Sequence, residues 1–474
     1  MRLSLVAVLV VATLAEPALA QNGTESVLAG LDARRDAYAA IAHEIWGFAE
    51  VGYQETRSSA LLQHQLRDAG FVVKSGVAEI PTAFVATWGS GKPIIGIIGE
   101  FDALPGLSQD TTPARKPLAD GGPGHGCGHH LFGTASTAAA VAVKDWLAAT
   151  HHSGTIRFYG TPAEEGGSGK VFMVRAGLFD DVDAVVAWHP GDRNEATPSS
   201  SLANINAKFR FHGIASHAAA APERGRSALD AVESMDYMVN MMREHVPQET
   251  RIHYVITNGG KAPNVVPDFA EVYLYARHPD MRTLDDIWER IVNAAKGAAL
   301  GTGTTMDMQI IGSVYNVLPN DYLATLQKKN LERVGGVTYT PAERAFGETI
   351  RKTLTEPMLP LGSERTVVTT RGDVASASTD LGDVSWRVPT VSMTAATWVP
   401  GTPAHSWQAT AAGGTSIGTK GMMVAAKSMA LTAIDLFTDP TNLVKARAEF
   451  EQRKAGFVYR SRLAEAKPAL DYRK

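Results

Sequence analysis

The feature that most constrains the fold is an alternation of short apolar segments with an alanine-rich segment. Three apolar segments have the length and composition of buried strands: KPIIGIIGEFDALPG, GTIRFYGTPAEEGG and DAVVAWHPG. Between the first two lies HLFGTASTAAAVAVKDWLAAT, in which apolar residues recur at helical spacing. Strands that alternate with helices predict an α/β fold with a doubly wound, mainly parallel sheet.

Each of these predicted strands ends in side chains that can bind a metal ion. Glu100 and Asp102 follow the first strand, Glu164 and Glu165 follow the second, and His189 follows the third. In doubly wound sheets, ligands bind beyond the carboxyl ends of the strands, so these side chains should lie at one edge. Taken singly, the glutamate pair could be a solvated turn and the histidine a hydrogen-bonded loop residue. Taken together, they favour a functional site.

The single cysteine of the 474-residue chain lies in the segment GHGCGHH. Cys127 could be an inert core thiol, a nucleophile activated at a helix start, or a metal ligand. Zinc binds thiolate, imidazole and carboxylate, and a pair of metal ions needs about five or six ligands. Cys127, His129, Glu165 and His189 begin such a set. A nucleophilic cysteine would leave the other three residues unexplained, so we interpret the segment as part of a metal centre.

Charge and the first residues limit the cellular setting. Lys and Arg number 45 against 49 Asp and Glu, a balance that argues against nucleic acid or an anionic membrane surface as a partner.

Residues 1–20 contain Arg2, an apolar run and Ala18-Leu19-Ala20, which predicts a cleaved signal peptide. No later apolar run approaches the length of a membrane span. We expect an exported protein, periplasmic or secreted; a buried N-terminal helix is the alternative.

The segment 204–313 differs in character from its flanks. It reads as a strand and a helix, then two strands and a second helix, which predicts an α+β domain inserted between catalytic parts 21–203 and 314–440. A methionine-containing stripe on the first helix should be core or a dimer seam. Only helix and loop can be assigned in 319–370, and the charged tail 441–474 is expected to begin as an exposed helix.

Five motifs resemble the amidohydrolase branch of the di-zinc aminoacylase and carboxypeptidase G-like metallopeptidases. They are GEFDALPGLSQ, GHGCGHHLFGTA, TPAEEGGSGK, STDLGDVSW and GTPAHSWQ, and they occur in the family's order. Within the branch they are closest to the aminobenzoyl-glutamate hydrolase B-subunit group. The resemblance implies a metal-dependent enzyme with two zinc or manganese ions. Its substrates would be N-acyl or N-aroyl amino acids, or short peptides, with a free carboxylate. A catalytically inactive subunit that binds such conjugates is the alternative.

The resemblance also implies a role for each matched residue. The implied metal ligands are Cys127, His129, Glu165, His189 and His405. Glu164 matches the general base, and Asp102 matches an aspartate that orients the site. Glu100 departs from the wider family, in which a histidine ligand stands at this position. His125 and His130 match no ligand and are interpreted as loop and helix-start residues.

The inserted domain matches the family's lid and dimerisation domain. His217 matches a histidine that reaches the scissile carbonyl, often from the partner subunit. Asn264 and Arg277 match groups that bind the free carboxylate of the substrate, and a guanidinium can donate two parallel hydrogen bonds to such a group. We therefore expect a homodimer formed through the lid, and a second, different subunit remains open.

Overall fold

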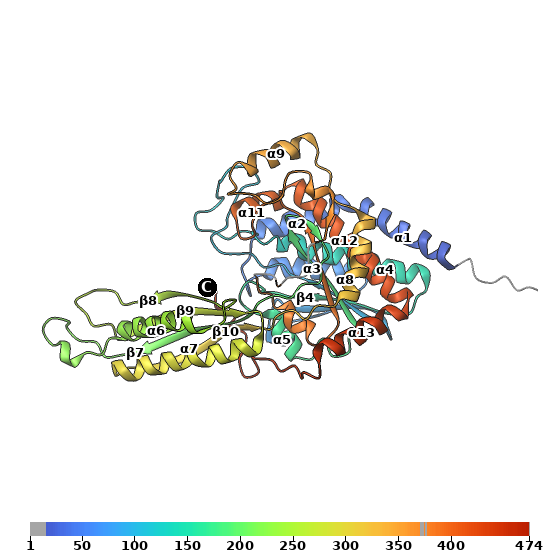
Figure 1. Cartoon of the computed structure of the whole chain (residues 1–474). Coiled ribbons are helices and arrows are strands. Elements are labelled where there is room, and N and C mark those ends of the chain that lie inside the picture. Colours follow the sequence, from blue (N-terminus) through green and yellow to red (C-terminus); the bar gives the residue numbers. More distant parts are fainter. Residues whose placement is uncertain (1–15, 370–373, 375–376, 474) are drawn as a thin grey trace, which may run out of the picture.

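The computed structural model describes residues 16–369, 374 and 377–473 (Figure 1). Helix α1 spans Glu16–Ala33, so the cleavage motif of the predicted signal peptide lies in its first turns, whereas residues 1–15 lie outside the described residues. Two lobes make up this part of the chain, a main domain and an elongated inserted domain (Figure 1). Each lobe has its own hydrophobic core.

A mixed, mainly parallel sheet forms the centre of the main domain. Its strands are β1 (Val72–Ser75), β2 (Phe84–Ser90), β3 (Ile94–Gly99), β4 (Gly154–Gly160), β5 (Ala184–Gly191), β6 (Asn194–Glu195), β11 (Val367–Val368) and β12 (Thr390–Ala396). In the described chain their order is β1-β2-β4-β3-β5-β12-β6-β11. The three strands expected from sequence are β3, β4 and β5, which lie side by side and parallel. The α/β prediction is confirmed.

Further helices of the main domain lie around this sheet or on the helices that cover it. They are α2 (Arg35–Phe48), α3 (Thr56–Asp68), α4 (His129–Thr150), α5 (Gly169–Arg175), α8 (Asp321–Val334), α9 (Pro341–Arg351), α10 (Leu381–Ser385), α11 (Trp407–Gly413), α12 (Ser416–Thr438) and α13 (Pro440–Lys454). The alanine-rich helix α4 packs on α12 and on β3. Among the described helices, α12 alone is long and apolar enough to cross a membrane, but its most apolar stretch is 83% buried inside the protein, as in a core helix.

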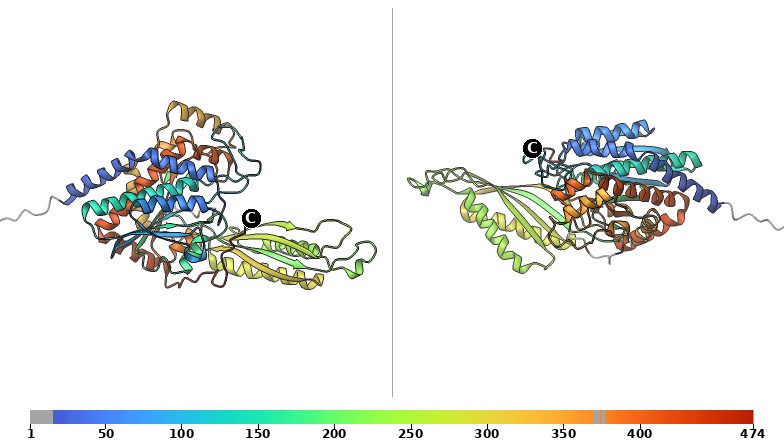
Figure 2. Two further views of the ribbon diagram at one scale, coloured as in Figure 1. Left: turned by 180° about the vertical axis from the view of Figure 1, so that it is seen from behind. Right: turned by 90° about the horizontal axis from the view of Figure 1, so that it is seen from above.

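The inserted domain is a four-stranded antiparallel sheet with two helices on one face (Figure 2). Its elements are β7 (Ala203–His212), α6 (Ala228–Met242), β8 (Arg251–Asn258), β9 (Phe269–His278), α7 (Met281–Thr302) and β10 (Thr305–Val314). Burial alternates along β9, so one face of the sheet packs on the helices. Met235 and Val239 are fully buried there, which places the methionine stripe in the core of this domain.

The charged tail is not a free helix, which corrects the expectation from sequence. Helix α13 packs on α8, and Phe450 is 2% exposed. The Asn320 side chain donates a hydrogen bond to the Ala446 carbonyl at 2.8 Å. The apolar Ala446 and Phe450 form one narrow buried face among charged neighbours. Segment 455–473 then continues to the junction of the two lobes.

Candidate metal centre

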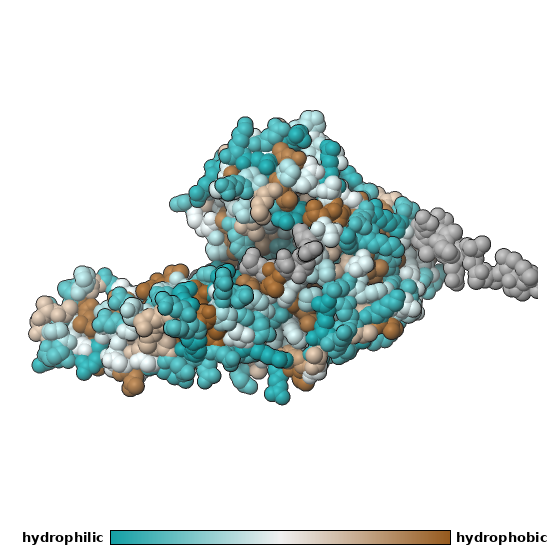
Figure 3. Space-filling view, viewed as in Figure 1, coloured by the Kyte–Doolittle hydropathy of each residue, from teal (hydrophilic) through white to brown (hydrophobic). Residues whose placement is uncertain are grey.

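A cavity of about 750 Å³ lies between the two lobes, beyond the carboxyl ends of β3, β4 and β5. Figure 3 shows the surface hollowed where the inserted domain meets the main domain. The residues expected from sequence that line the cavity are Cys127, Glu164, Glu165, His189, Arg277 and His405. The structure therefore brings together side chains from segments that are up to 278 residues apart in the sequence.

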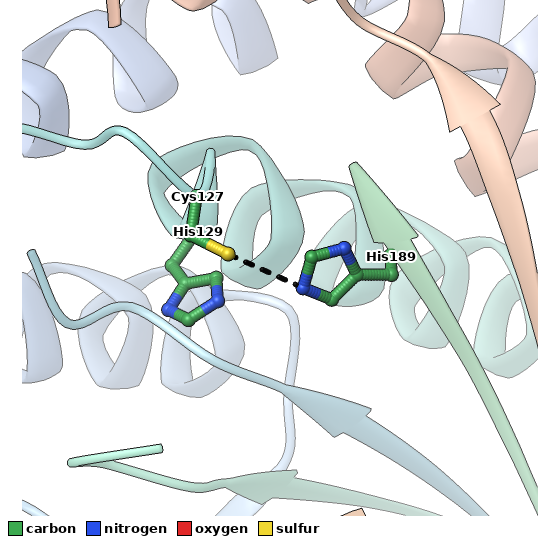
Figure 4. Close-up of side chains that lie close together, drawn as sticks. All are labelled: Cys127, His129 and His189. Atoms are coloured by element: carbon green, nitrogen blue, oxygen red, sulfur yellow. Dashed lines mark hydrogen bonds between the residues drawn. The ribbon is translucent and has the colours of Figure 1, made fainter. Parts of the chain in front are cut away.

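Cys127 is shared by two groups of potential metal ligands. One group combines it with His129 and His189, and the other with Glu165 and His405; within each group the ligand atoms lie within 4.8 Å of one another. Figure 4 shows the first group: the cysteine precedes α4, His129 begins α4, and His189 lies on β5. The Cys127 Sγ atom lies 3.5 Å from His189 Nε2. Two adjacent groups that share one sulfur provide potential ligands for a pair of metal ions.

Hydrogen bonds on the far side of two imidazoles orient their metal-binding nitrogens. His129 Nδ1 lies 2.9 Å from Asp102 Oδ1, and His189 Nδ1 lies 2.7 Å from the Pro190 carbonyl oxygen. Because each partner is an acceptor, each Nδ1 carries the proton and Nε2 keeps a free lone pair. Both Nε2 atoms belong to the first ligand group. These contacts of Asp102 are consistent with the orienting role that the resemblance implies.

Two buried carboxylates also hold the turn that carries Glu164 and Glu165. Asp102 accepts a hydrogen bond from the Glu165 backbone N–H at 2.9 Å. Glu55 accepts one from the Ala163 N–H at 2.8 Å, where the backbone has a φ of 57° in the left-handed region. Burial, reinforced by Asp102, raises the pKa of Glu55 to about 8. Sequence reasoning missed Glu55, because no motif marks it.

Several polar atoms in the site approach each other without forming hydrogen bonds. His129 Nε2 lies 3.1 Å from Glu100 Oε2, yet neither atom has a hydrogen-bond partner. Glu165 Oε1, 3.0 Å from His405 Nε2, is likewise buried without one. Burial, with the neighbouring carboxylates, raises the pKa of Glu164 well above its ordinary value. Unpaired lone pairs and crowded carboxylates fit divalent cations, which would satisfy both.

The electrostatic surroundings of Cys127 argue against its use as a free nucleophile. Burial raises the pKa of the thiol well above its ordinary value, and Glu165 raises it further. A reactive cysteine needs the opposite, a positive environment that lowers the thiol pKa. Coordination to a cation would deprotonate this thiol, so the surroundings of Cys127 favour the metal-ligand interpretation.

A buried lysine beneath the centre accounts for the glutamate at position 100, where the wider family has a histidine. Lys170 Nζ lies 2.7 Å from Glu100 Oε1 and 2.6 Å from Asp380 Oδ1, and all three side chains are at most 3% exposed. One Glu100 oxygen is thus committed to the lysine, while the other faces His129. Lys170 and Asp380 stand within the quoted motifs, but only the tertiary structure pairs them.

Of the residues predicted in the inserted domain, one reaches the cavity within a single chain. Arg277 lines it from the helix-free face of β9. His217 and Asn264 are exposed and adjacent, since the Ala218 N–H donates to the Asn264 carbonyl at 3.0 Å, but neither lines the cavity. Arg473 was not predicted from sequence, yet it lines the cavity from the C-terminal segment.

The two histidines that were not assigned as ligands have structural partners. His125 Nε2 lies 3.1 Å from the Ile45 carbonyl oxygen, and His130 Nε2 lies 3.0 Å from that of Gly413. Burial lowers the pKa of both imidazoles, which keeps them neutral. Their interpretation as loop and helix-start residues agrees with these contacts.

Comparisons with known proteins identify the family to which the chain is similar. The model of peptidase family M20/M25/M40 matches residues 96–412. The chain is 42% identical over 449 residues to the B-subunit of p-aminobenzoyl-glutamate hydrolase from Escherichia coli, covering 89% of this chain and 93% of that protein. It is 29% identical over 437 residues to the Xaa-Arg dipeptidase of Mus musculus, covering 89% and 90%.

Solved structures show the same fold. An aminobenzoyl-glutamate utilization protein from Klebsiella pneumoniae matches with a TM-score of 0.61 at 18% identity, covering 85% of this chain and 97% of that one. The Bacillus subtilis YXEP protein, a dinuclear metal binding peptidase from the M20 family, matches with a TM-score of 0.56 at 16% identity, covering 86% and 99%. The chain therefore belongs to peptidase family M20/M25/M40 and is a hydrolase of carbon–nitrogen bonds with the family's dinuclear metal fold.

Proposed function

We propose that the protein hydrolyses the amide bond of N-acyl or N-aroyl amino acids that carry a free carboxylate. The observation that carries the proposal is the position of Glu164, in the cavity beside two ligand groups that share Cys127. The Escherichia coli relative is named for aminobenzoyl-glutamate, which is such a conjugate and is the first substrate to test. Short peptides with a free carboxylate belong to the same class.

Two divalent cations, zinc or manganese, would be held by the two ligand groups. His129 and His189 would bind one, Glu165 and His405 the other, and Cys127 is available to both. When bound, the cations would lower the pKa of a bound water and polarise the scissile carbonyl. Metal analysis of the purified protein by mass spectrometry identifies the ions, and a content well below two would contradict this assignment.

The protein's own residues supply proton transfer and orientation. Glu164 takes a proton from the attacking water and returns it to the leaving nitrogen, so that amide and water become a carboxylic acid and a free amino acid. Asp102 holds His129 and the Glu165 backbone in place. Arg277 lines the cavity where its guanidinium can bind the substrate carboxylate.

A panel of conjugates tests the proposal against the alternative of an inactive binding subunit. Aminobenzoyl-glutamate, other N-aroyl and N-acyl amino acids, and dipeptides are assayed with zinc or manganese, and Glu164→Gln serves as a control that retains the ligands. We expect turnover that EDTA abolishes and metal restores. Tight binding without turnover of any conjugate, at full metal content, would instead support the binding subunit.

We also propose a homodimer formed through the inserted domain. Strand β8 lies at the edge of its sheet, and Val255 and Ile256 are 65% and 40% exposed. Hydrophobic residues gather along this edge of the domain (Figures 1 and 3). An exposed apolar edge strand is a surface for pairing with a second chain. In such a dimer, His217 of one protomer would stabilise the oxyanion formed in the site of the other.

Mixing two inactive variants tests this exchange of residues. A mixed dimer of Glu164→Gln with His217→Ala holds one site with both groups intact, so part of the activity should return. Absence of recovery after verified subunit exchange would exclude a donated histidine. Activity that requires an added, different subunit would show that the chain works as one half of a larger enzyme.

Export is proposed from the composition of residues 1–20. Removal after Ala20 would leave most of α1, including Val27 and Leu31, which pack in the main core. The mature chain should therefore begin near Gln21. Mass measurement of the protein from the periplasm or medium checks this, and an intact N-terminus on the intracellular protein would contradict it.

A further inference from the structure

The last part of the described chain returns to the metal centre. Segment 455–473 is tied to the inserted domain by a bidentate ion pair between Arg462 and Asp285 of α7. It ends beside the turn of the general base, where Arg473 Nη2 donates a hydrogen bond to the Glu165 carbonyl oxygen at 2.5 Å. This contact joins residues 308 positions apart in the sequence.

Aromatic contacts fix the position of Arg473. Its guanidinium lies over the Tyr472 ring, 5.0 Å from the ring centroid. The Tyr472 and Tyr53 rings pack in a T-shaped arrangement with their centroids 5.7 Å apart. Gly166 leaves room beside it: a Cβ there would lie 3.2 Å from Tyr275 Oη and 3.7 Å from Arg473 Nη2. The guanidinium therefore sits in a built pocket against the cavity, rather than on a free tail.

Among the described residues, Arg277 and Arg473 are the guanidinium groups that line the cavity, and neither is paired with a described acidic side chain. Each has a buried Nε without a hydrogen-bond partner, and within the described part of the chain neither forms an ion pair. The described carboxylates that line the cavity have other roles: Glu100 and Asp380 pair with Lys170, Glu165 belongs to a ligand group, and Glu164 is the proposed base. A buried N–H donor without a partner is costly, so a bound anion is the group that would complete each guanidinium.

We propose that Arg473 binds the side-chain carboxylate of an acidic amino acid in the substrate, while Arg277 binds its α-carboxylate. This rests on the proposed amide hydrolysis and narrows its substrate class to conjugates of dicarboxylic amino acids. An uncharged side chain would leave the buried Arg473 Nε without an anionic partner. The expected preference for a glutamate conjugate over the matching glutamine conjugate is about 10²-fold in kcat/KM.

Kinetics with aminobenzoyl-glutamate and aminobenzoyl-glutamine test the proposal. Arg473→Ala should lower kcat/KM for the glutamate conjugate by about 10²-fold, mainly through KM, and leave the glutamine conjugate within about threefold. The kcat/KM of Arg473→Lys for the glutamate conjugate should lie between those of the wild type and Arg473→Ala. Arg460→Ala removes the same charge from an exposed position in the same segment, and should leave kcat/KM unchanged for both conjugates. Metal content is measured for every variant.

The outcomes separate this proposal from the one on which it rests. Equal losses for both conjugates would show that Arg473 only supports the Glu165 turn, and an unchanged preference in Arg473→Ala would also overturn the proposal. If the wild type hydrolyses neither conjugate, the proposed reaction fails. Calorimetric binding of free L-glutamate and L-glutamine then decides the role of Arg473, because only a carboxylate-binding residue makes their affinities differ and loses that difference on substitution.

Discussion

Replacement of Lys170 by methionine tests whether one ammonium group holds the buried charges beneath the metal centre. Its Nζ atom contacts Glu100 at 2.7 Å and Asp380 at 2.6 Å, and its side chain is fully buried. Burial by itself would lower the lysine pKa, but the two carboxylates outweigh it and raise the pKa, so the group is charged. Methionine keeps a similar unbranched shape and removes the ammonium group, with its charge and its hydrogen-bond donors.

The expected loss of unfolding free energy depends on the number of charges that are left unpaired. Breaking a buried ion pair costs about 3–5 kcal/mol, and here two carboxylates lose their partner, which favours the upper half of that range. An unfolding entropy of about 2.1 cal/mol/K per residue gives about 0.7 kcal/mol/K for a main domain of roughly 350 residues. The Tm of Lys170→Met should therefore fall by about 6 °C.

Scanning calorimetry at matched metal content measures this change, and a surface lysine provides the control. Lys116 Nζ also pairs with a carboxylate, that of Asp110 at 2.8 Å, but its side chain is 65% exposed. Lys116→Met should cost less than about 1 kcal/mol. Adding Asp380→Asn to Lys170→Met should restore part of the stability, because it removes one unpaired charge. A Tm for Lys170→Met within about 1 °C of the wild type would refute the reasoning.

Three further predictions concern the site and its pH dependence. Cys127→Ser should lower both metal content and activity, because a hydroxyl binds these metals less well than a thiolate, and full metal content in an inactive variant would favour a nucleophilic cysteine. Glu164→Gln should keep both metals and lose at least about 10²-fold in kcat, whereas Glu165→Gln should lose metal; retention of both metals by both variants would show that the pair is misassigned. Burial raises the pKa of Asp383 to about 7. Its ordinary value is about 3.9, so the folded state binds more protons between about pH 4 and 7, and stability falls as pH rises through that window. Asp383→Asn should remove this part of the fall in the free energy of unfolding, measured by urea denaturation at each pH. Identical pH dependence of stability in both proteins would contradict the raised pKa of Asp383.

Sequence patterns were sufficient to locate the parallel strands and the side chains at their ends. Apolar runs of strand length and an alanine-rich helical period encode burial locally, so β3, β4, β5 and α4 could be located without a structure. The polar residues that follow each strand could be assigned to one edge, because parallel strands place their carboxyl ends together. Glu164, Glu165 and His189, which line the cavity, were found in this way, whereas Cys127 was singled out as the single cysteine of the chain.

The contacts between distant groups became known only from the folded chain. Lys170 meets Asp380 across 210 positions, and Arg473 meets Glu165 across 308. His217 and Asn264 share a surface of the inserted domain away from the cavity of their own chain. Local spacing predicts whether a side chain is buried, but it carries no information on which remote segment completes its hydrogen bonds. That choice is made by packing of the whole chain, where each buried charge must find a partner.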